Sequence, residues 1–291
     1  FKSRGYNIGA FDAATASDVL SGSGLSSSAA FEVLLGTILN HLFNDGKVSD
    51  VEIAQIAQAA ENKFFGKPCG LLDQMTSSVG SFVEIDFADP AKPVIEKLDF
   101  DFASCGYALC IVDTGGSHSD LTDEYAAVRK EMESVAEYLG KSVLREVDED
   151  EFMKNIADIR SSCGDRAVLR AMHFYGDNAR VEKQAAALKA GDFETFKKYI
   201  IESGRSSYMY NQNVYSCKKA SEQPVSLALS LSEKLLDGCG AWRVHGGGFA
   251  GTIQAFVPLN KLDEYKDLME KVFGSGSCYI LSVRPVGGVE L

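Results

Sequence analysis

The sequence predicts an α+β fold, because segments with helical periodicity and short strand-like segments both occur along its 291 residues. A helix is predicted from residue 119, where apolar side chains recur every three or four positions. Strands are predicted at 82–86 and 107–112, the second ending in the turn signal Asp113-Thr114-Gly115-Gly116. The length allows two lobes, with a boundary expected near 113–118. The apolar helix positions are Leu121, Tyr125, Val128, Met132, Val135 and Leu139.

Two further helices are predicted near the start of the chain. The first follows a loop at 21–28, and the second follows Ser49 and Glu52, which have the S-x-x-E form of a capping box. The apolar stripes are Phe31, Leu34, Leu35, Ile38 and Leu42 in the first, and Ile53, Ile56, Ala57, Ala60 and Phe64 in the second. Later in the chain, helices are predicted near 165–189, 193–203, 224–236 and 262–273, and strands at 241–245, 252–257 and 279–283.

The composition, with 45% hydrophobic and 24% charged residues, is ordinary for a soluble globular enzyme. A net charge of −12 argues against nucleic acid and anionic membranes as partners, and no run approaches the ~18 apolar residues of a membrane span. The seven scattered cysteines, without a CxxC pair, indicate reduced thiols in a cytoplasmic protein and argue against zinc. The first residues contain no apolar segment of a secretory signal. A chain that opens at Phe1 is expected to be a piece of a longer protein.

A glycine- and serine-rich loop leads into the first predicted helix. Glycine lets the backbone approach a ligand closely, and free N–H groups at a helix start favour an anion such as phosphate. No lysine follows the glycines, so the loop is not a Walker A motif. The alternative is a plain turn in which Ser28 caps the helix. The loop residues are Gly22, Ser23, Gly24, Leu25, Ser26, Ser27 and Ser28.

Glu61 is an acidic residue on the apolar stripe of the second helix. It follows Ala57 by four residues and Ile53 by eight, so it is expected on the same face. A carboxylate in that position requires a cation or an ion pair. The alternatives are a buried salt bridge or a helix rotated slightly toward solvent.

Asp73 lies in a segment punctuated by Pro68 and Gly70, where an aspartate is ordinarily a turn former. A magnesium–triphosphate site takes few protein ligands, typically one carboxylate and one hydroxyl. Glu61 and Ser28 fit these two roles. Asp73 is then a candidate to orient or deprotonate an attacking hydroxyl.

A second glycine cluster occurs at 246–251 and has the G-x-G-x-x-G form of a dinucleotide-binding motif. A predicted strand, not a helix, follows it, and too little chain remains for a βαβ unit. A tight turn packed beside phosphates is the better interpretation, with His245 as a candidate to touch a phosphate oxygen. His173 and Asp177 are spaced i,i+4 like a metal pair, but without a third ligand a solvated helix face is expected.

Three of these segments together resemble the galactokinases, members of the GHMP kinase superfamily of small-molecule kinases. Residues 22–30 are similar to the superfamily's phosphate loop, and 246–251 to its third motif. Residues 61–74 are similar to the family segment that holds a metal-binding glutamate and a catalytic aspartate. The resemblance covers nearly the whole chain, and the P-C-G-x-x-D-Q element separates galactokinases from most other superfamily members.

The resemblance implies a two-lobed GHMP kinase fold with mixed and antiparallel sheets and helices, lacking the N-terminal strands. Residues 1–115 would be the remainder of the N-terminal ATP and magnesium domain, and 116–291 the C-terminal domain. The implied activity is transfer of the γ-phosphate of ATP to O1 of galactose, giving galactose 1-phosphate, with ATP and Mg²⁺ as cofactors.

The resemblance also implies roles for single residues. Ser28 and Glu61 would hold magnesium, and Asp73 would act on the anomeric hydroxyl of the sugar. Tyr125 matches a family tyrosine that touches galactose, although its place on the apolar stripe fits core packing equally well. Gly247 and Gly248 would bind ATP together with the loop at 22–28.

Two departures leave alternatives open. The stretch 208–215 lacks the family's acidic pattern, and nothing in residues 1–18 resembles its N-terminal sugar-binding motif. The alternatives are a related kinase for N-acetylgalactosamine or arabinose, and a sensor that binds ATP and sugar without transfer. A chain without that motif is expected to be inactive by itself and to self-associate; the sequence leaves its oligomeric state open.

Overall fold

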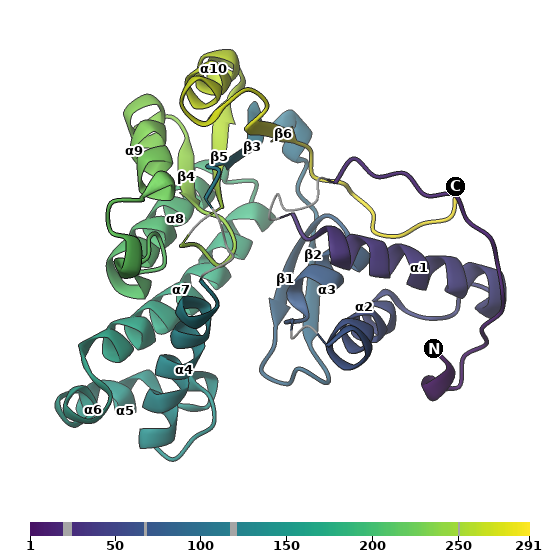
Figure 1. The fold of residues 1–291 in the computed structure, drawn as a ribbon, viewed down its shortest axis with the longest axis horizontal. Coiled ribbons are helices and arrows are strands. Elements are labelled where there is room, and N and C mark those ends of the chain that lie inside the picture. Colours follow the sequence, from purple (N-terminus) through teal and green to yellow (C-terminus); the bar gives the residue numbers. More distant parts are fainter. Residues whose placement is uncertain (20–24, 67–68, 117–120, 250) are drawn as a thin grey trace. The chain divides into compact units, whose positions relative to one another are not determined.

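The computed structural model describes residues 1–19, 25–66, 69–116, 121–249 and 251–291. These residues form two compact units (Figure 1). Unit 1 contains residues 1–100 together with the C-terminal segment 283–291, and unit 2 contains residues 101–282. The mixture of helices with small antiparallel sheets confirms the predicted α+β class.

The described residues of unit 1 form three α-helices and a two-stranded antiparallel sheet. The sheet pairs Phe82 with Leu98, and the predicted capping box is present, with the Glu52 N–H donating to Ser49 Oγ at 3.3 Å. The C-terminal segment returns to this unit, where the Ser81 N–H donates to the Arg284 carbonyl at 2.7 Å. The elements are a 3₁₀ turn (Lys2–Arg4), α1 (Ser27–Asn44), α2 (Asp50–Ala60), a π-helical turn (Glu61–Phe65), α3 (Leu72–Val79), β1 (Phe82–Asp86) and β2 (Val94–Leu98).

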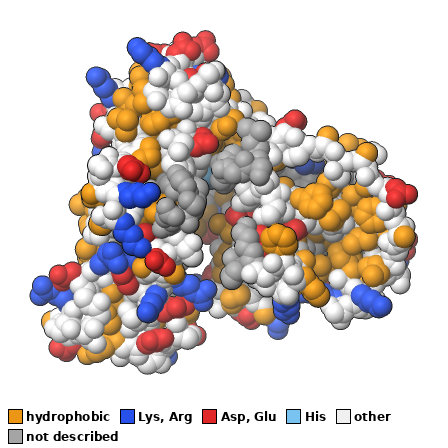
Figure 2. All heavy atoms as spheres, viewed as in Figure 1, with side chains coloured by type: hydrophobic (Ala, Val, Ile, Leu, Met, Phe, Trp, Pro, Cys, Tyr) orange, Lys and Arg blue, Asp and Glu red, His pale blue; other side chains and the backbone are white. Residues whose placement is uncertain are grey.

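The apolar stripe predicted for α1 is not its buried face, which corrects the prediction. Phe31 and Leu42 are 51% and 58% exposed, and Figure 2 shows hydrophobic side chains gathered over α1. The opposite face packs on α2 and α3 through small and polar residues, and Asn40 donates to the Val48 carbonyl at 3.0 Å. Because these buried residues are small or polar, a pattern of large apolar side chains does not identify the buried face of α1. The buried residues are Ala29, Val33, Gly36, Thr37, Asn40 and Asn44.

The stripe predicted for α2 is correct at its start and wrong at its end. Ile53, Ala57 and Glu61 are buried on one face, as their spacing predicts. Phe64 is 88% exposed, because the helix changes from α to π at Glu61 and no longer follows the 3.6-residue period. π-Turns of this kind are frequent at functional sites.

Unit 2 contains a four-stranded antiparallel sheet in the order β4-β5-β3-β6. Helices α8 and α9 pack against β4, and α10 packs against β3, β5 and β6. The core between them includes Cys110, Val112, Val225, Leu236, Trp242, Ile253, Ala255, Tyr265 and Met269. The strands are β3 (Tyr107–Asp113), β4 (Ala241–Val244), β5 (Thr252–Pro258) and β6 (Cys278–Leu281), and the helices are α8 (Phe193–Ser206), α9 (Pro224–Leu236) and α10 (Leu262–Phe273).

A second core in unit 2 is entirely helical. Val135 of the predicted amphipathic helix packs with Phe152, Ile159 and Ala171, all shielded from solvent. The elements of this part are α4 (Thr122–Tyr138), α5 (Glu149–Lys154), α6 (Ile156–Cys163) and α7 (Asp165–Lys189), with a π-helical turn (Ser207–Asn211) after α8 and short 3₁₀ turns at Phe102–Ser104, Leu144–Glu146, Cys217–Lys219 and Leu259–Lys261. Within the described part of the chain, no helix is long and apolar enough to cross a membrane.

The two compact units have their own bounds, and the predicted domains 1–115 and 116–291 stay a prediction. Strand β3 pairs with β5 along its whole length and with β6 along part of it, so residues 101–115 group with unit 2. Residues 283–291 group instead with unit 1. Strand pairing between distant segments, which no local pattern encodes, sets the bounds of these compact units.

Candidate functional site

Asp73 lies in the first turn of α3, not in the loop that its proline and glycine neighbours predict. The helix is short, and its buried face includes the polar residues Gln74 and Ser78, so it shows little apolar periodicity. The Asp73 carboxylate is exposed, and its Oδ2 accepts a hydrogen bond from Ser26 Oγ at 2.5 Å. This contact joins the residue before α1 to the start of α3.

A polar cluster around Gln74 lies next to Asp73 in the sequence. The Gln74 side-chain nitrogen Nε2 donates to Glu61 Oε2 at 3.0 Å and to Glu32 Oε2 at 3.3 Å. Glu61 is only 3% exposed, and Glu32 on α1 is half-buried. One amide group therefore bridges carboxylates from two helices of unit 1.

Cys69 contacts the same cluster. Asn62 holds its backbone in place by accepting from the Cys69 N–H at 2.7 Å, and Gln74 Nε2 lies 3.5 Å from the sulfur. Burial and the neighbouring Glu61 carboxylate raise the pKa of the Cys69 thiol to about 11. The thiol is therefore protonated at neutral pH and poorly suited to act as a nucleophile.

The residues around Glu61 fit a magnesium ion by their chemistry. Gln74 Oε1 is buried and has no hydrogen-bond partner among the described residues, so the cluster offers an amide oxygen beside two carboxylates. Ser28 stands one helical turn before Glu32 on α1 and adds a hydroxyl to that side of the helix. Mg²⁺ prefers such oxygen ligands and keeps several waters or phosphates in its shell. A site of three or more His, Cys, Asp or Glu side chains does not occur among the described residues.

The loop predicted to bind ATP is partly described. Gly22, Ser23 and Gly24 lie outside the described residues, while Leu25 and Ser26 precede α1, and Ser27 and Ser28 form its first turn. Ser26 adopts a left-handed backbone conformation with φ 56° and ψ 52°. That conformation is costly for a residue other than glycine, asparagine or aspartate, and such residues cluster at ligand sites.

The second glycine cluster forms a tight turn in unit 2, followed by strand β5 as predicted. Gly246, Gly248 and Phe249 all have positive φ values of 60° to 80°. The Phe249 N–H donates to the Asn213 carbonyl at 2.5 Å, and Asn213 Nδ2 donates to the Gly247 carbonyl at 3.1 Å. We call residues 246–249 the glycine turn; Ala250 lies outside the described residues.

Tyr125 packs directly on this turn. Its hydroxyl donates to the Gly248 carbonyl at 2.8 Å, and its ring meets that of Phe249 edge-on at 5.5 Å. A cavity of about 500 Å³ in unit 2 is lined by Tyr125 together with Phe174, Asn213, Gly246 and Gly247. Tyr125 thus contacts both the apolar helix interface and a cavity. His245 is bonded through Nδ1 to Gln254 Oε1 at 3.2 Å.

The solvated face predicted for His173 and Asp177 is wrong. His173 is buried against α8, with its Nδ1 2.9 Å from Ser206 Oγ, and Asp177 Oδ1 accepts from Ser203 Oγ at 2.6 Å. Burial lowers the pKa of His173. The two side chains therefore help to pack α7 against α8. The i,i+4 spacing of His173 and Asp177 on α7 could not indicate that a second helix covers them.

The sequence analysis gave no role to three residues of these sites, which are Glu32, Gln74 and Asn213. Glu32 bonds to Gln74 beside Glu61, and its spacing of four residues from Ser28 was an available signal. Asn213 binds the glycine turn through both its backbone and its side chain. It lies 34 residues from Gly247 in the sequence, so no local pattern could have indicated it.

The fold is that of a GHMP kinase. Residues 2–81 match the family described as GHMP kinases N terminal domain. The structure of Lactococcus lactis galactokinase complexed with galactose is similar with a TM-score of 0.72, at 24% identity, over 94% of this chain and 69% of that one. The L. major mevalonate kinase in complex with R-mevalonate is similar with a TM-score of 0.56, at 14% identity, over 90% of this chain and 66% of that one.

Sequence similarity to individual proteins identifies the family within the GHMP kinases. Galactokinase from Actinobacillus pleuropneumoniae is 31% identical over 258 residues, which are 89% of this chain and 64% of that protein. Galactokinase from Homo sapiens is 32% identical over 281 residues, which are 97% of this chain and 68% of that protein. The chain belongs to the galactokinase family. It spans 64% of the length of the A. pleuropneumoniae relative.

Proposed function

We propose that this chain is part of a kinase that transfers the γ-phosphoryl group of ATP to O1 of galactose. The observation that carries the proposal is the cluster in unit 1, where Ser26 contacts Asp73 and the neighbouring Gln74 bridges to Glu61. In this cluster, the exposed carboxylate of Asp73 is available to bind a substrate hydroxyl, and the buried carboxylate of Glu61 is available to bind a metal ion. The family membership supplies the reaction class and the sugar.

In this proposal, Asp73 orients the anomeric hydroxyl of the sugar and accepts its proton as the new O–P bond forms. The bond between the γ-phosphorus and its bridging oxygen breaks in the same transfer, and ADP leaves. The carboxylate is accessible at the start of α3, and the helix fixes its direction. Positioning the attacking oxygen contributes most of the rate, because the phosphoryl group itself needs little covalent assistance. Tyr125 is assigned to the sugar as a contact.

Glu61 and Ser28 would hold Mg²⁺, which, when bound, neutralises negative charge on the phosphates. The loop at 22–28 and the glycine turn, through Gly247 and Gly248, are assigned to ATP. Backbone N–H groups in such segments bind phosphate oxygens without a side chain in the way.

The test is release of ADP from MgATP in the presence of galactose, with Asp73→Asn as the variant. Because this chain alone is expected to be inactive, the assay is made with the full-length protein. There we expect galactose-dependent release that falls about 10²-fold or more in the variant, since a positioned acid–base group contributes at least that much. Near-normal turnover by Asp73→Asn would overturn the assignment of Asp73. Release that depends on another acceptor, in a panel with N-acetylgalactosamine and arabinose, would overturn galactose.

A further inference from the structure

The segment that leads from α8 to α9 contains the stretch 208–215, whose sequence departs from the family's acidic pattern. Its π-helical turn ends at Asn211, and Gln212 closes the turn in a left-handed conformation, donating its N–H to the Ser207 carbonyl at 2.8 Å. Asn213, the next residue, makes the two hydrogen bonds to the glycine turn described above. We call residues 211–216 the support segment.

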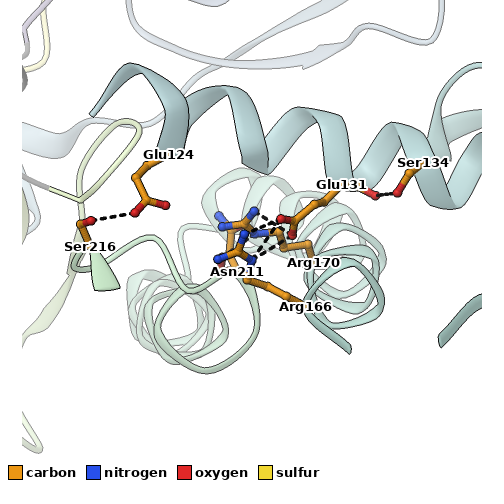
Figure 3. A network of polar contacts seen from close by, with 7 residues as sticks. All are labelled: Glu124, Glu131, Ser134, Arg166, Arg170, Asn211 and Ser216. Atoms are coloured by element: carbon orange, nitrogen blue, oxygen red, sulfur yellow. Dashed lines mark hydrogen bonds and ion pairs between the residues drawn. The ribbon is translucent and has the colours of Figure 1, made fainter. Parts of the chain in front are cut away.

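Helix α4 holds one end of the support segment, and helix α7 holds the other (Figure 3). At one end, Ser216 Oγ donates to Glu124 Oε1 at 2.7 Å. At the other end, Arg170 of α7 donates from Nε to the Asn211 carbonyl at 3.1 Å, while its Nη1 lies 2.9 Å from Glu131 Oε2. Asn213 lies between these two attachments.

Arg170 is poorly explained as a simple stabilising ion pair. Its side chain is 1% exposed, and a guanidinium so completely removed from water is costly even when paired. Glu131 already has a second cation, Arg166, whose Nη2 lies 2.5 Å from Oε1. What Arg170 adds is the bond to the Asn211 carbonyl, which Arg166 does not make.

We infer that Arg170 is a positioning residue for the glycine turn, acting through the support segment and Asn213. The turn is sensitive to this segment, because a Cβ on Gly248 would lie 1.9 Å from the Asn213 carbonyl oxygen. The backbone of the turn and that of Asn213 are therefore in direct contact. An effect of Arg170 on ATP binding rests on the proposed function, whereas its effect on the conformation of the glycine turn does not.

The first experiment measures amide hydrogen exchange in the turn for the unliganded chain. In Arg170→Met we expect the Phe249 amide to exchange about tenfold faster or more, since a buried hydrogen bond to a charged group is lost. Arg166→Met is the matched control: it removes a Glu131 partner without touching Asn211, and the turn should stay as protected as in the wild type. Unchanged exchange in folded Arg170→Met, or equal acceleration in Arg166→Met, would overturn the inference.

Two further variants separate positioning from charge and from loss of folding. Arg170→Lys keeps the charge near Glu131 but lacks the planar fork that reaches both partners, so exchange in the turn should remain faster than in the wild type. Full protection in Arg170→Lys would overturn the positioning role. If Arg170→Met does not fold, Asn213→Ala decides: it removes only the bond to the Gly247 carbonyl and should accelerate exchange at the turn, and no acceleration would overturn the inference.

The second experiment measures the affinity of the same proteins for MgATP. We expect Arg170→Met and Asn213→Ala to bind about tenfold more weakly than the wild type, and Arg166→Met to bind equally well. Equal affinity in all four proteins would overturn the link from the support segment to nucleotide binding. A wild-type chain that does not bind MgATP would count against the proposed function, while the exchange result would still decide the role of Arg170.

Discussion

Ser26 donates a 2.5 Å hydrogen bond to Asp73, and it does so from a left-handed backbone conformation. The contact fixes the residue before α1 to the first turn of α3, 47 residues later in the sequence. A serine in this conformation pays a steric cost that glycine would avoid. Its hydroxyl and its backbone therefore have opposite effects on stability, and two variants can separate them.

Ser26→Ala and Ser26→Gly both remove the hydroxyl, but only glycine removes the Cβ that makes the left-handed backbone conformation costly. We expect Ser26→Gly to be more stable than Ser26→Ala by about 1 kcal/mol, the cost of a left-handed residue with a Cβ. The measurement is the free energy of unfolding in urea. An alanine variant as stable as the glycine variant would show that residue 26 does not hold this conformation in solution.

Glu61→Gln should remove the stabilisation that magnesium gives with ATP. A ligand at 100 times its Kd adds about 2.7 kcal/mol to the free energy of unfolding, which appears as a rise in the melting temperature. We expect this magnesium-dependent rise in the wild type and not in Glu61→Gln. The comparison is Glu32→Gln, which changes the half-buried carboxylate on α1 that also accepts from Gln74. A rise that survives Glu61→Gln and disappears in Glu32→Gln would transfer the metal-binding role to Glu32.

Gly248→Ala should be far more destabilising than Gly246→Ala, although both glycines have positive φ values. A Cβ at residue 246 would meet no atom within 4 Å, so that variant should lose only about 1 kcal/mol. A Cβ at residue 248 would overlap the Asn213 carbonyl, and we expect a loss of about 3 kcal/mol or more. The check is urea unfolding of both variants, and similar losses would contradict the packing of the turn on Asn213.

His173 should make the protein less stable as the pH falls below about 6.5, the ordinary pKa of a histidine. Burial lowers its pKa in the folded state, with Arg243 and Arg180 adding to the effect and Asp177 opposing it. The unfolded chain then binds more protons than the folded one in this range, so the free energy of unfolding rises with pH there. His173→Gln should lose less stability between pH 7 and pH 5 than the wild type. An equal loss in both proteins would exclude His173 as the cause.

Elements with strong local signals were predicted correctly from the sequence. Strand β1 and three helices, α7, α9 and α10, have the predicted bounds. In the helices, the apolar periodicity agrees with local start and stop signals, such as proline at the start of α9 and glycine after the end of α10. Strand β2 and helices α3, α5 and α6 were not predicted. They are five to eight residues long, and β2 and α3 have mostly polar or exposed side chains, so local patterns are weak there.

The sequence by itself determined the family, the place of Glu61 on the apolar face of its helix and the candidate residues Ser28, Glu61 and Asp73, because these depend on motifs and spacing within one segment. The tertiary structure alone decided which residues meet. Ser26 contacts Asp73, Gln74 joins Glu61 to α1, and Asn213 supports the glycine turn, over separations of 13 to 47 residues. Such contacts arise when helices and strands pack, and the free energy of packing depends on the whole core and not on local sequence.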